Sequence, residues 1–536
     1  MTHCSECHHP KRLGLTAPPL LPELFSRSAK GRLEKIISDG LPATQMPSFK
    51  DTLDSEQIKL LSEFIQTPAQ ELDWNFDDIR SSIIKFNEPA KVLKADIENI
   101  TLVMERGTQS LAVLDGNGFA QLAKFRVGAV HGGPKFSYSL DKVYALARDG
   151  IVTVFNLRTL TSELSLKAGI NSRSIAVSGD DKTIAVANYL PANVVFFNDR
   201  MEPVGEIKVN GKIGGFYSLP KLHSFVLSFR EKPELWIIGD SAPFEVKKYP
   251  LPDAFHYLSI SPVRSLIIGT KRGSGHMYIY DYDKHETLAK LSTRGLPHLA
   301  SAAFWIHGGE LFAGVNHIQE PVATIISLDH LKTVAEIPLP GAGFFVRTHY
   351  ATPYLWIDTE TEQIALVDKN DFNDIRYITP HKGRKAMHVE FTKDGDYALV
   401  TIPGDGGEVV IYDAKTINVV KSLPFERPVG KYNAINKTYP DRSLAPPTAV
   451  AANSGKDVFD NFCMGCHHQT YEAFGPPFSQ IANERNAAQI RFHILAPEAS
   501  ARILGYKENS MPKINLTKEQ LDAIVKYIQS FSHVGG

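Results

Sequence analysis

The sequence predicts an all-β propeller of eight blades, flanked by two small all-α domains, and three observations support this prediction. An apolar strand pattern recurs about every 40–45 residues between about residue 95 and residue 440, which is the period of a four-stranded blade. A Cys-x-x-Cys-His motif stands near each end of the chain, and a stretch with apolar residues at helical spacing follows each motif. At 536 residues the chain is long enough for three such units.

We therefore expect three domains. The helical domains should cover residues 1–75 and 450–536, the propeller should cover 85–442, and the Pro- and Ala-containing stretch 444–453 should be a linker. A motif cysteine at position 4 leaves no room for a complete first helix, and no basic-then-apolar leader precedes it. We expect the chain to be a mature or trimmed form of a secreted protein.

Composition narrows the class of protein. A hydrophobic content of 43% with 22% charged residues is ordinary for a soluble chain. A formal net charge of −1 gives no basis for attraction to nucleic acid or to an anionic membrane surface. The chain has no run of eighteen apolar residues, so we expect no membrane span.

All four cysteines belong to the two motifs, so we expect no disulfide. The motifs are Cys4, Cys7 and His8 at one end, and Cys463, Cys466 and His467 at the other. Two thiols at this spacing can form thioether bonds to the two vinyl groups of one porphyrin, and the next residue then presents its imidazole to the iron. A thioredoxin-like pair or half of a zinc site usually lacks the histidine, and neither explains two copies. The motifs predict two covalently bound c haems.

A methionine near the last helix of each small domain is the predicted second axial ligand. Met46, followed by proline, precedes a helical pattern over 52–66, and Met511, also followed by proline, precedes one over 517–531. Thioether and imidazole ligation raises the haem potential, which suits electron transfer. The second histidines of the two Cys-His-His runs are alternatives to these methionines: His9 and His468.

The propeller repeat consists of an apolar strand, a few polar residues, a second apolar strand ending near Asp or Asn, and a third. Clear copies cover 142–156, 183–198, 265–281 and 396–413, and further copies begin near Ile100, His223, Glu310 and Pro353. Eight blades leave a wide central funnel, which can hold a large flat ligand.

A c-type haem domain joined to an eight-bladed propeller resembles the cytochrome cd1 family, whose propellers bind haem d1. Gly128-Ala-Val-His131 resembles the family's Gly-x-x-x-His element, which implies that His131 is the proximal ligand of the d1 iron. The segments ending in His256 and His298 fall where the nitrite reductases carry their two distal-pocket histidines. The stretch 429–433 resembles the family's closing Gly-Lys-Phe-Asn element. The resemblance covers about residues 1–440, and the C-terminal cytochrome is not part of the usual pattern.

Departures from the reductase pattern favour another branch of the family, the one that oxidises dihydro-haem d1. The segment 228–236 lacks the histidines of the reductases, and His388 stands where the dehydrogenase branch has a pocket histidine. The N-terminal stretches 12–14 and 41–46 also resemble that branch.

Haem d1 carries several carboxylates, so its pocket should combine an imidazole with cationic side chains. The candidates at or near the inner strands are Arg148, Arg173, Arg230 and Arg347. Lys135 could add a fifth positive charge, and Tyr189 matches a family tyrosine near the ring. Each arginine could instead form a salt bridge between blades.

The resemblance implies three alternative functions. As a dehydrogenase, the protein would convert a propionate of dihydro-haem d1 into an acrylate, with His388 and His298 as candidates for base and distal ligand. Electrons would leave through the c haems to a soluble periplasmic cytochrome or cupredoxin, and cytochrome cd1 nitrite reductase could receive the product. As a nitrite reductase, it would use His256 and His298 to protonate bound nitrite. The third alternative is a non-enzymatic haem d1 carrier.

Overall fold

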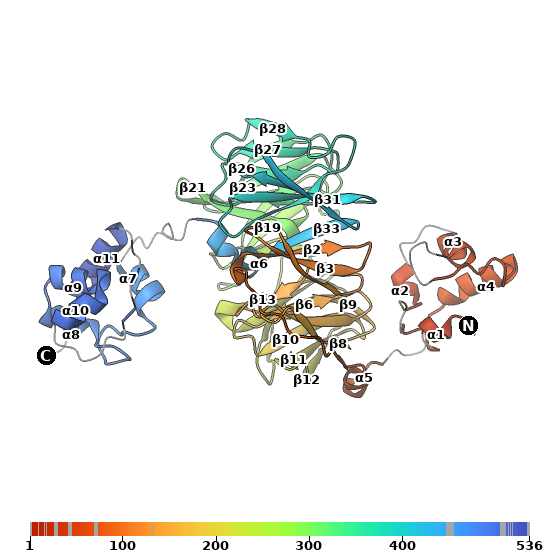
Figure 1. Cartoon of the computed structure of the whole chain (residues 1–536), viewed down its shortest axis with the longest axis horizontal. Helices are drawn as coiled ribbons and strands as arrows, with labels where there is room; N and C mark the ends of the chain where they lie inside the picture. Colours follow the sequence, from red (N-terminus) through yellow and green to blue (C-terminus); the bar gives the residue numbers. More distant parts are fainter. Residues whose placement is uncertain are drawn as a thin grey trace. The chain divides into compact units, whose positions relative to one another are not determined.

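The computed structural model describes residues 3–8, 10–14, 17, 19–25, 31–40, 46–68, 73–130, 132–445, 455–503, 511–512, 514, 516 and 518–532. The chain divides into two compact units, 1–444 and 445–536 (Figure 1). None of the described helices is long and apolar enough to cross a membrane.

Eight antiparallel sheets form the propeller, which confirms the predicted fold class. Each blade is given from its innermost to its outermost strand. The first blade consists of β33 (Pro428–Asn433), β2 (Ile100–Glu105), β3 (Ser110–Asp115) and β4 (Gln121–Arg126). The second consists of β5 (Lys135–Phe136), β6 (Lys142–Leu146), β7 (Ile151–Asn156) and β8 (Thr161–Lys167), and β1 (Ile84–Lys85) pairs with the outer edge of β8. The third consists of β9 (Asn171–Val177), β10 (Thr183–Leu190), β11 (Asn193–Asn198) and β12 (Pro203–Lys208), and the fourth of β13 (Ile213–Leu219), β14 (Ser224–Phe229), β15 (Glu234–Gly239) and β16 (Val246–Pro250).

The other four blades have the same order. They are β17 (Tyr257–Ile260), β18 (Leu266–Thr270), β19 (His276–Asp281) and β20 (Glu286–Ser292); β21 (Ala303–His307), β22 (Glu310–Asn316), β23 (Val322–Ser327) and β24 (Lys332–Pro338); β25 (Val346–Arg347), β26 (Tyr354–Asp358), β27 (Ile364–Asp368) and β28 (Ile375–Ile378); and β29 (Met387–Phe391), β30 (Tyr397–Ile402), β31 (Gly407–Asp413) and β32 (Val419–Phe425).

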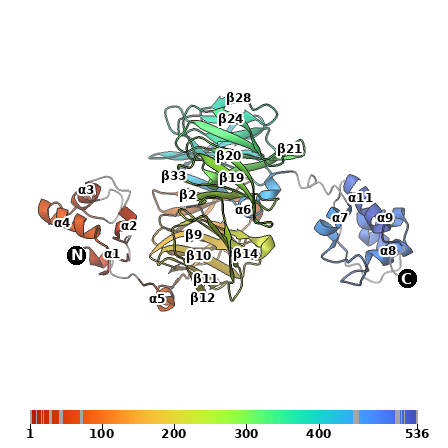
Figure 2. The same cartoon turned by 180° about the vertical axis from the view of Figure 1, so that it is seen from behind.

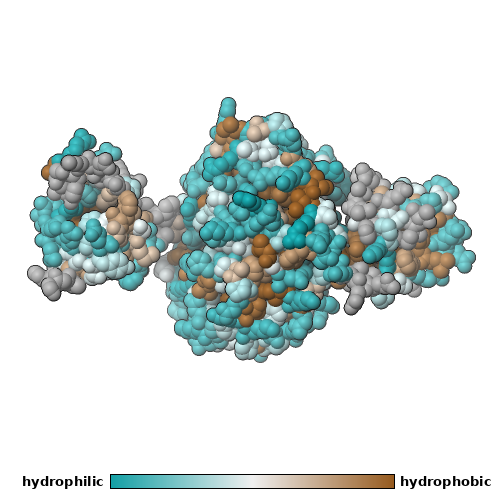
Figure 3. Space-filling view, turned by 90° about the horizontal axis from the view of Figure 1, so that it is seen from below, coloured by the Kyte–Doolittle hydropathy of each residue, from teal (hydrophilic) through white to brown (hydrophobic). Residues whose placement is uncertain are grey.

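Burial explains the strand patterns. Every residue of β2, β14 and β23 is buried, because these strands lie inside a blade with another blade on each face. Outer strands such as β12 and β24 alternate between buried or half-buried and exposed residues, as expected at a solvent edge. Figure 3 shows a propeller surface that is mainly hydrophilic, with apolar residues gathered in a few patches.

The last strand of the propeller closes the ring. β33 pairs antiparallel with β2, with Leu102 opposite Tyr432, and the two strands lie side by side in Figures 1 and 2. Because β33 comes more than 300 residues after β2, the first blade cannot be complete until the whole propeller sequence is present.

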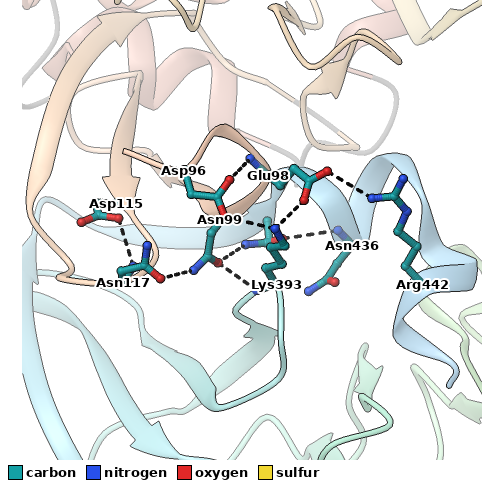
Figure 4. Close-up of polar contacts among 9 residues, drawn as sticks. Asp96, Glu98, Asn99, Asp115, Asn117, Lys393, Asn436 and Arg442 are labelled. Carbon is teal, nitrogen blue, oxygen red and sulfur yellow. Dashed lines mark hydrogen bonds and ion pairs between the residues drawn. The ribbon is translucent and has the colours of Figure 1, made fainter. Parts of the chain in front are cut away.

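A short segment, α6 (Ala434–Thr438) and η4 (Pro440–Ser443), follows β33 and is anchored by the polar network of Figure 4. Lys393 pairs at 3.1 Å with Asp96, which immediately precedes η1 (Ile97–Asn99). It also pairs with Glu98, which lies within η1. Arg442 pairs with Glu98 at 3.2 Å (Figure 4). The Asn436 amide donates to the Phe391 carbonyl at 3.0 Å. The network fixes this segment to the blades at both sides of the ring closure.

The N-terminal domain is helical, with α1 (Ser5–His8), α2 (Pro22–Phe25), α3 (Arg32–Asp39) and α4 (Ser55–Ile65). The helix expected over 52–66 begins at Ser55, because the Asp54 carboxylate accepts the Gln57 N–H at 2.8 Å in a capping box. A connecting helix, α5 (Phe76–Ser81), follows, and the nearby Trp74 indole donates to the Lys167 carbonyl at 2.8 Å.

The C-terminal unit is also helical. Its elements are α7 (Gly455–Val458), the π-turn η5 (Phe459–Cys463), α8 (Phe478–Glu484), α9 (Ala487–Leu495), α10 (Pro497–Ile503) and α11 (Lys518–Gln529). The helix expected over 517–531 is α11, and its apolar face packs into the core of this unit through Leu521, Ile524, Val525 and Ile528.

Candidate haem sites

The C-terminal motif and its predicted methionine line one cavity. Cys463, Cys466, His467 and Met511 all contribute to a space of about 270 Å³ whose other walls are largely apolar. His467 Nδ1 donates to the Pro476 carbonyl at 2.7 Å, so in the neutral ring Nε2 keeps its lone pair for a metal. This donor set and cavity fit a covalently attached c haem.

Gly475 allows this arrangement. A Cβ atom at this position would lie 2.5 Å from His467 Cε1, far inside van der Waals contact. The backbone of 475 therefore packs directly on the imidazole, and only glycine permits that approach.

In the N-terminal domain the motif lies on α1, where His8 is buried. Arg12, just beyond the motif, donates to the Phe64 carbonyl at 2.7 Å and to the Thr67 carbonyl at 3.2 Å, at the end of α4. These bonds tie the segment that follows the motif to the end of α4. Of the two candidates for the second axial ligand of this haem, Met46 is among the residues that the structure describes and His9 is not.

The predicted proximal ligand of the d1 iron, His131, also lies outside the described residues, so its role stays a prediction. The preceding residue, Val130, forms an isolated bridge with Ala147 next to the second blade in chain order.

The other candidate histidines meet at one end of the funnel. His256 immediately precedes β17, His298 precedes η3 (Leu299–Ser301) and β21, and His388 is the second residue of β29. Arg173 and Arg347 lie on β9 and β25. All of these strands are the innermost of their blades, and their first residues meet at the same end. We call this group of five residues the histidine mouth.

The His298 ring is fixed by its Nδ1 atom. This atom lies 2.8 Å from the Phe344 carbonyl oxygen and 2.7 Å from Ser301 Oγ. Burial lowers the pKa of His298, and the charges of Arg347 and Arg173 lower it further. Since a carbonyl can only accept, Nδ1 carries the hydrogen and Nε2 has a free lone pair in the neutral ring.

His388 has the opposite arrangement. Its Nδ1 accepts the backbone N–H of Lys431 at 3.3 Å, which leaves the hydrogen on Nε2 in the neutral ring. The ring packs 4.4 Å from Phe345 and edge-on to Tyr432 at 5.4 Å, measured between centroids. Burial, followed by the charges of Lys431 and Arg347, holds the pKa of His388 well below its usual range.

Asp358, a residue that sequence reasoning missed, connects the two histidines. It is fully buried and accepts backbone N–H groups from Phe344 at 2.7 Å, Phe345 at 2.9 Å and His388 at 3.2 Å. The Phe344 carbonyl in turn holds His298. Burial raises the pKa of Asp358 to about 6, despite these three bonds.

The two arginines of the histidine mouth bond to backbone carbonyls. Arg173 donates to Gly214 at 3.1 Å, and its Nε is buried without a hydrogen-bond partner among the described residues. Arg347 donates to Ser301 at 3.0 Å. Both guanidinium groups therefore retain N–H donors for a carboxylate ligand.

Lys135 lies on β5 within reach of Arg173. Burial and the charge of Arg173 lower its pKa to about 8. A bound carboxylate would stabilise the ammonium form of this lysine.

The remaining candidates lie at the ends of second strands rather than on inner strands. Arg230 follows β14 and donates to the Tyr189 hydroxyl at 2.5 Å, while Tyr189, in β10, donates to the Ile213 carbonyl at 3.2 Å. Arg148 lies between β6 and β7. Because second strands end where inner strands begin, these side chains belong to the same end of the funnel as the histidine mouth.

A cavity of about 650 Å³ lies toward the other end of the funnel. Its walls come from the later residues of β9, β13 and β17, from β21, and from α6 and η4. Lys135 and Arg347 line it, but the three candidate histidines do not. The described part of the funnel thus has two distinct regions, which share these two cations.

The fold and its sites define a class: a propeller with a histidine- and arginine-lined funnel, joined to helical domains with c-haem motifs. The Cytochrome D1 heme domain family matches residues 95–437, and the chain belongs to this family. A Cytochrome c model matches 452–532, and one named Cytochrome C oxidase, cbb3-type, subunit III matches 1–65. These matches indicate binding of haem c and of a d1-type haem.

Individual relatives agree. The chain is 34% identical over 455 residues to Dihydro-heme d1 dehydrogenase of Pseudomonas aeruginosa, covering 81% of this chain and 92% of that protein. It is 25% identical to Nitrite reductase of Stutzerimonas stutzeri, covering 81% and 91%. A solved structure, dihydro-heme d1 dehydrogenase NirN in complex with DHE, matches with a TM-score of 0.77 at 34% identity, covering 82% of this chain and 98% of that one.

Proposed function

We propose that this protein oxidises dihydro-haem d1, removing two hydrogens from one propionate side chain to give an acrylate, and passes the two electrons to c haems. The observation that carries the proposal is the pair His298 and His388 in the histidine mouth. In the neutral rings, Nε2 of His298 can accept a hydrogen bond, whereas Nε2–H of His388 can donate one. The 34% identity to a dihydro-heme d1 dehydrogenase supports it.

His298 is the proposed proton acceptor. Its Nε2 lone pair can take a proton from a side-chain carbon of the substrate, while Nδ1 stays bonded to the Phe344 carbonyl. Its lowered pKa keeps the ring neutral, and thus able to accept, near neutral pH.

His388 is the proposed donor to the substrate carboxylate. Its Nε2–H is available because Nδ1 is occupied by the Lys431 amide. The sequence left both histidines as candidates for the base, and the hydrogen bonds favour His298 for that role. Arg173, Arg347 and Lys135 would bind the other carboxylates of the macrocycle, and His131 would hold its iron.

The c-haem sites complete the balance of the reaction. The substrate loses two protons and two electrons, and a bound c haem supplies a one-electron acceptor. His8 with Met46, and His467 with Met511, would ligate the two irons. We infer that a soluble cytochrome or cupredoxin in the periplasm then receives the electrons, and that cytochrome cd1 nitrite reductase uses the product.

Nitrite reduction is the second candidate, because His256 and His298 are both present at one end of the funnel. That reaction needs an imidazolium to protonate an oxygen of nitrite. The lowered pKa of His298 disfavours the imidazolium near neutral pH, and the Nδ1 bond to the Phe344 carbonyl leaves Nε2 as an acceptor, so proton acceptance is favoured over donation.

One anaerobic experiment separates the candidates. The purified protein, with both c haems oxidised, is mixed with dihydro-haem d1 and separately, after reduction, with nitrite. We expect a product two hydrogens lighter and c-haem reduction in the first mixture, and no nitric oxide in the second. Nitric oxide formation without oxidation of dihydro-haem d1 would contradict the proposal, as would tight binding of the macrocycle without turnover, which is the behaviour of a carrier.

A further inference from the structure

The cavity of about 650 Å³ at the far end of the funnel shares Lys135 and Arg347 with the proposed substrate site, but none of the three candidate histidines lines it. Its lining includes Glu390 on β29, Lys437 on α6, and Leu222, which is 41% exposed. The cavity therefore connects buried charged groups with the protein surface.

Glu390 links this cavity to the histidine mouth. It lies two residues after His388 on β29, is only 6% exposed, and lines the cavity. Burial raises the pKa of its carboxyl, although three cations oppose this effect: Arg347, Lys437 and Lys431. A β-bulge at His388 interrupts the regular alternation of side chains on β29, but His388 and Glu390 lie near the same three cations, Arg347, Lys431 and Lys437, so both belong to one cluster of ionisable groups.

Lys437 is the next group. Its Nζ lies 5.5 Å from the centre of the Tyr432 ring, and that ring contacts His388 edge-on. Burial, followed by the charges of Lys135 and Arg347, lowers the pKa of Lys437 to about 7. An amine with this pKa exchanges protons readily at neutral pH.

Two neighbours of Lys437 indicate that the cavity holds water. Asn436 and Thr438 both line the cavity. Their side-chain oxygens, Asn436 Oδ1 and Thr438 Oγ1, are buried and have no hydrogen-bond partner among the described residues. Buried polar atoms of this kind are normally satisfied by ordered water.

We propose that this cavity is the exit for protons released by substrate oxidation, with Glu390 and Lys437 as the relay between the histidine mouth and cavity water. The inference rests on the proposed function. There R–CH2–CH2–COO⁻ becomes R–CH=CH–COO⁻ with loss of two protons and two electrons, and the electrons go to the c haems. A macrocycle seated at the histidine mouth covers that end, so the protons leave through the other.

The relay returns each group to its starting state. A proton from the mouth adds to the Glu390 carboxylate, passes to the Lys437 amine, and leaves from the ammonium to water. The charged and titratable groups that face Glu390 are Arg347 on β25, Lys431 and Tyr432 on β33, and Lys437 on α6. Those that face Lys437 are Lys135 on β5, Arg347, Glu390, His388 and Tyr432.

The test follows two signals in one stopped-flow experiment. Full-length protein with oxidised c haems is mixed anaerobically with dihydro-haem d1 in weak buffer that contains a pH-indicator dye. In the wild type, c-haem reduction and dye protonation should run together. In Glu390→Gln and in Lys437→Met, haem reduction in the first turnover should persist while proton release slows by at least about tenfold.

Matched variants control for structural effects. Glu390→Asp keeps a carboxylate and should restore proton release, and Asp441→Asn, at the exposed rim of the cavity, should leave it unchanged. Proton release in step with haem reduction in both Glu390→Gln and Lys437→Met would overturn the relay while leaving the proposed function intact. If wild-type c haems are not reduced at all, the proposed function itself fails. Should Glu390→Gln not fold, Lys437→Met carries the test.

Discussion

The carboxylate of Asp358 accepts the backbone N–H of His388 at 3.2 Å, and the same side chain holds the Phe344 and Phe345 amides of the loop that positions His298. One buried carboxylate thus orients both histidines of the proposed reaction. His388 has a left-handed backbone, with φ of 48°, which is uncommon for residues other than glycine. The Asp358 bond helps to hold that conformation.

Asp358→Asn should change how stability depends on pH. The native carboxyl has a pKa of about 6, against 3.8 for an ordinary carboxyl, so between these values the folded protein holds a proton that the unfolded chain has lost. Wild-type stability from this group is therefore present below pH 4 and falls as the pH rises to 6. The difference corresponds to about 3 kcal/mol. Between pH 4 and pH 7, the free energy of unfolding of the variant should rise relative to that of the wild type by up to this amount. A difference between the two proteins that does not change with pH would contradict the assigned pKa.

The two histidines should separate in steady-state kinetics. His298→Gln removes the proton acceptor, so kcat for dihydro-haem d1 oxidation should fall by about 10²–10⁴ with little change in KM. His388→Ala removes a donor to the bound carboxylate, so KM should rise by about tenfold. His388→Gln, whose amide can still donate, should recover most of that loss. Equal losses of kcat in both variants, with unchanged KM, would refute the assigned roles.

Gly475→Ala should disrupt only the C-terminal c haem. The added methyl group would lie 2.5 Å from His467 Cε1, so the imidazole must move away from the iron. We expect loss of the low-spin spectrum of one haem, measured by electron paramagnetic resonance. Gly465→Ala is the matched control within the motif, because a Cβ there meets nothing within 4 Å, and its spectra should be those of the wild type.

The axial methionines can be tested one at a time. Met511 lines the same cavity as His467, so Met511→Ala should remove the weak near-infrared sulfur-to-iron band of one haem. Met46→Ala should remove the same band from the other haem, and the double variant should lose both. A band that survives in either single variant at full intensity would show that another side chain, such as His468, ligates the iron.

Periodicity and short motifs were enough to predict the eight blades, and the residues that they predict as C-terminal haem ligands lie around one cavity. Apolar runs mark the buried strands, and Cys463, Cys466, His467 and Met511 do line one cavity, because covalent chemistry fixes their spacing. The sequence placed Arg173 and Arg347 on inner strands correctly. It put Arg148 and Arg230 near those strands, whereas they lie at the ends of second strands.

Contacts between distant segments could not be predicted in this way. Asp358 lies 30 residues from His388, and the Lys431 amide that sets the His388 tautomer lies 43 residues away. An aspartate or asparagine at the end of an apolar strand occurs in most blades, so nothing local distinguished Asp358. The far cavity was also missed, since Glu390 and Lys437 meet only when β33 closes the ring.

The most direct test of the account is the stoichiometry of a single turnover. The protein with both c haems oxidised is mixed anaerobically with excess dihydro-haem d1 and no external acceptor, and c-haem absorbance and the macrocycle product are quantified together. The account predicts one haem d1 formed for every two c haems reduced. Reduction of c haem without formation of the acrylate, or product formation with no c-haem reduction, would contradict it.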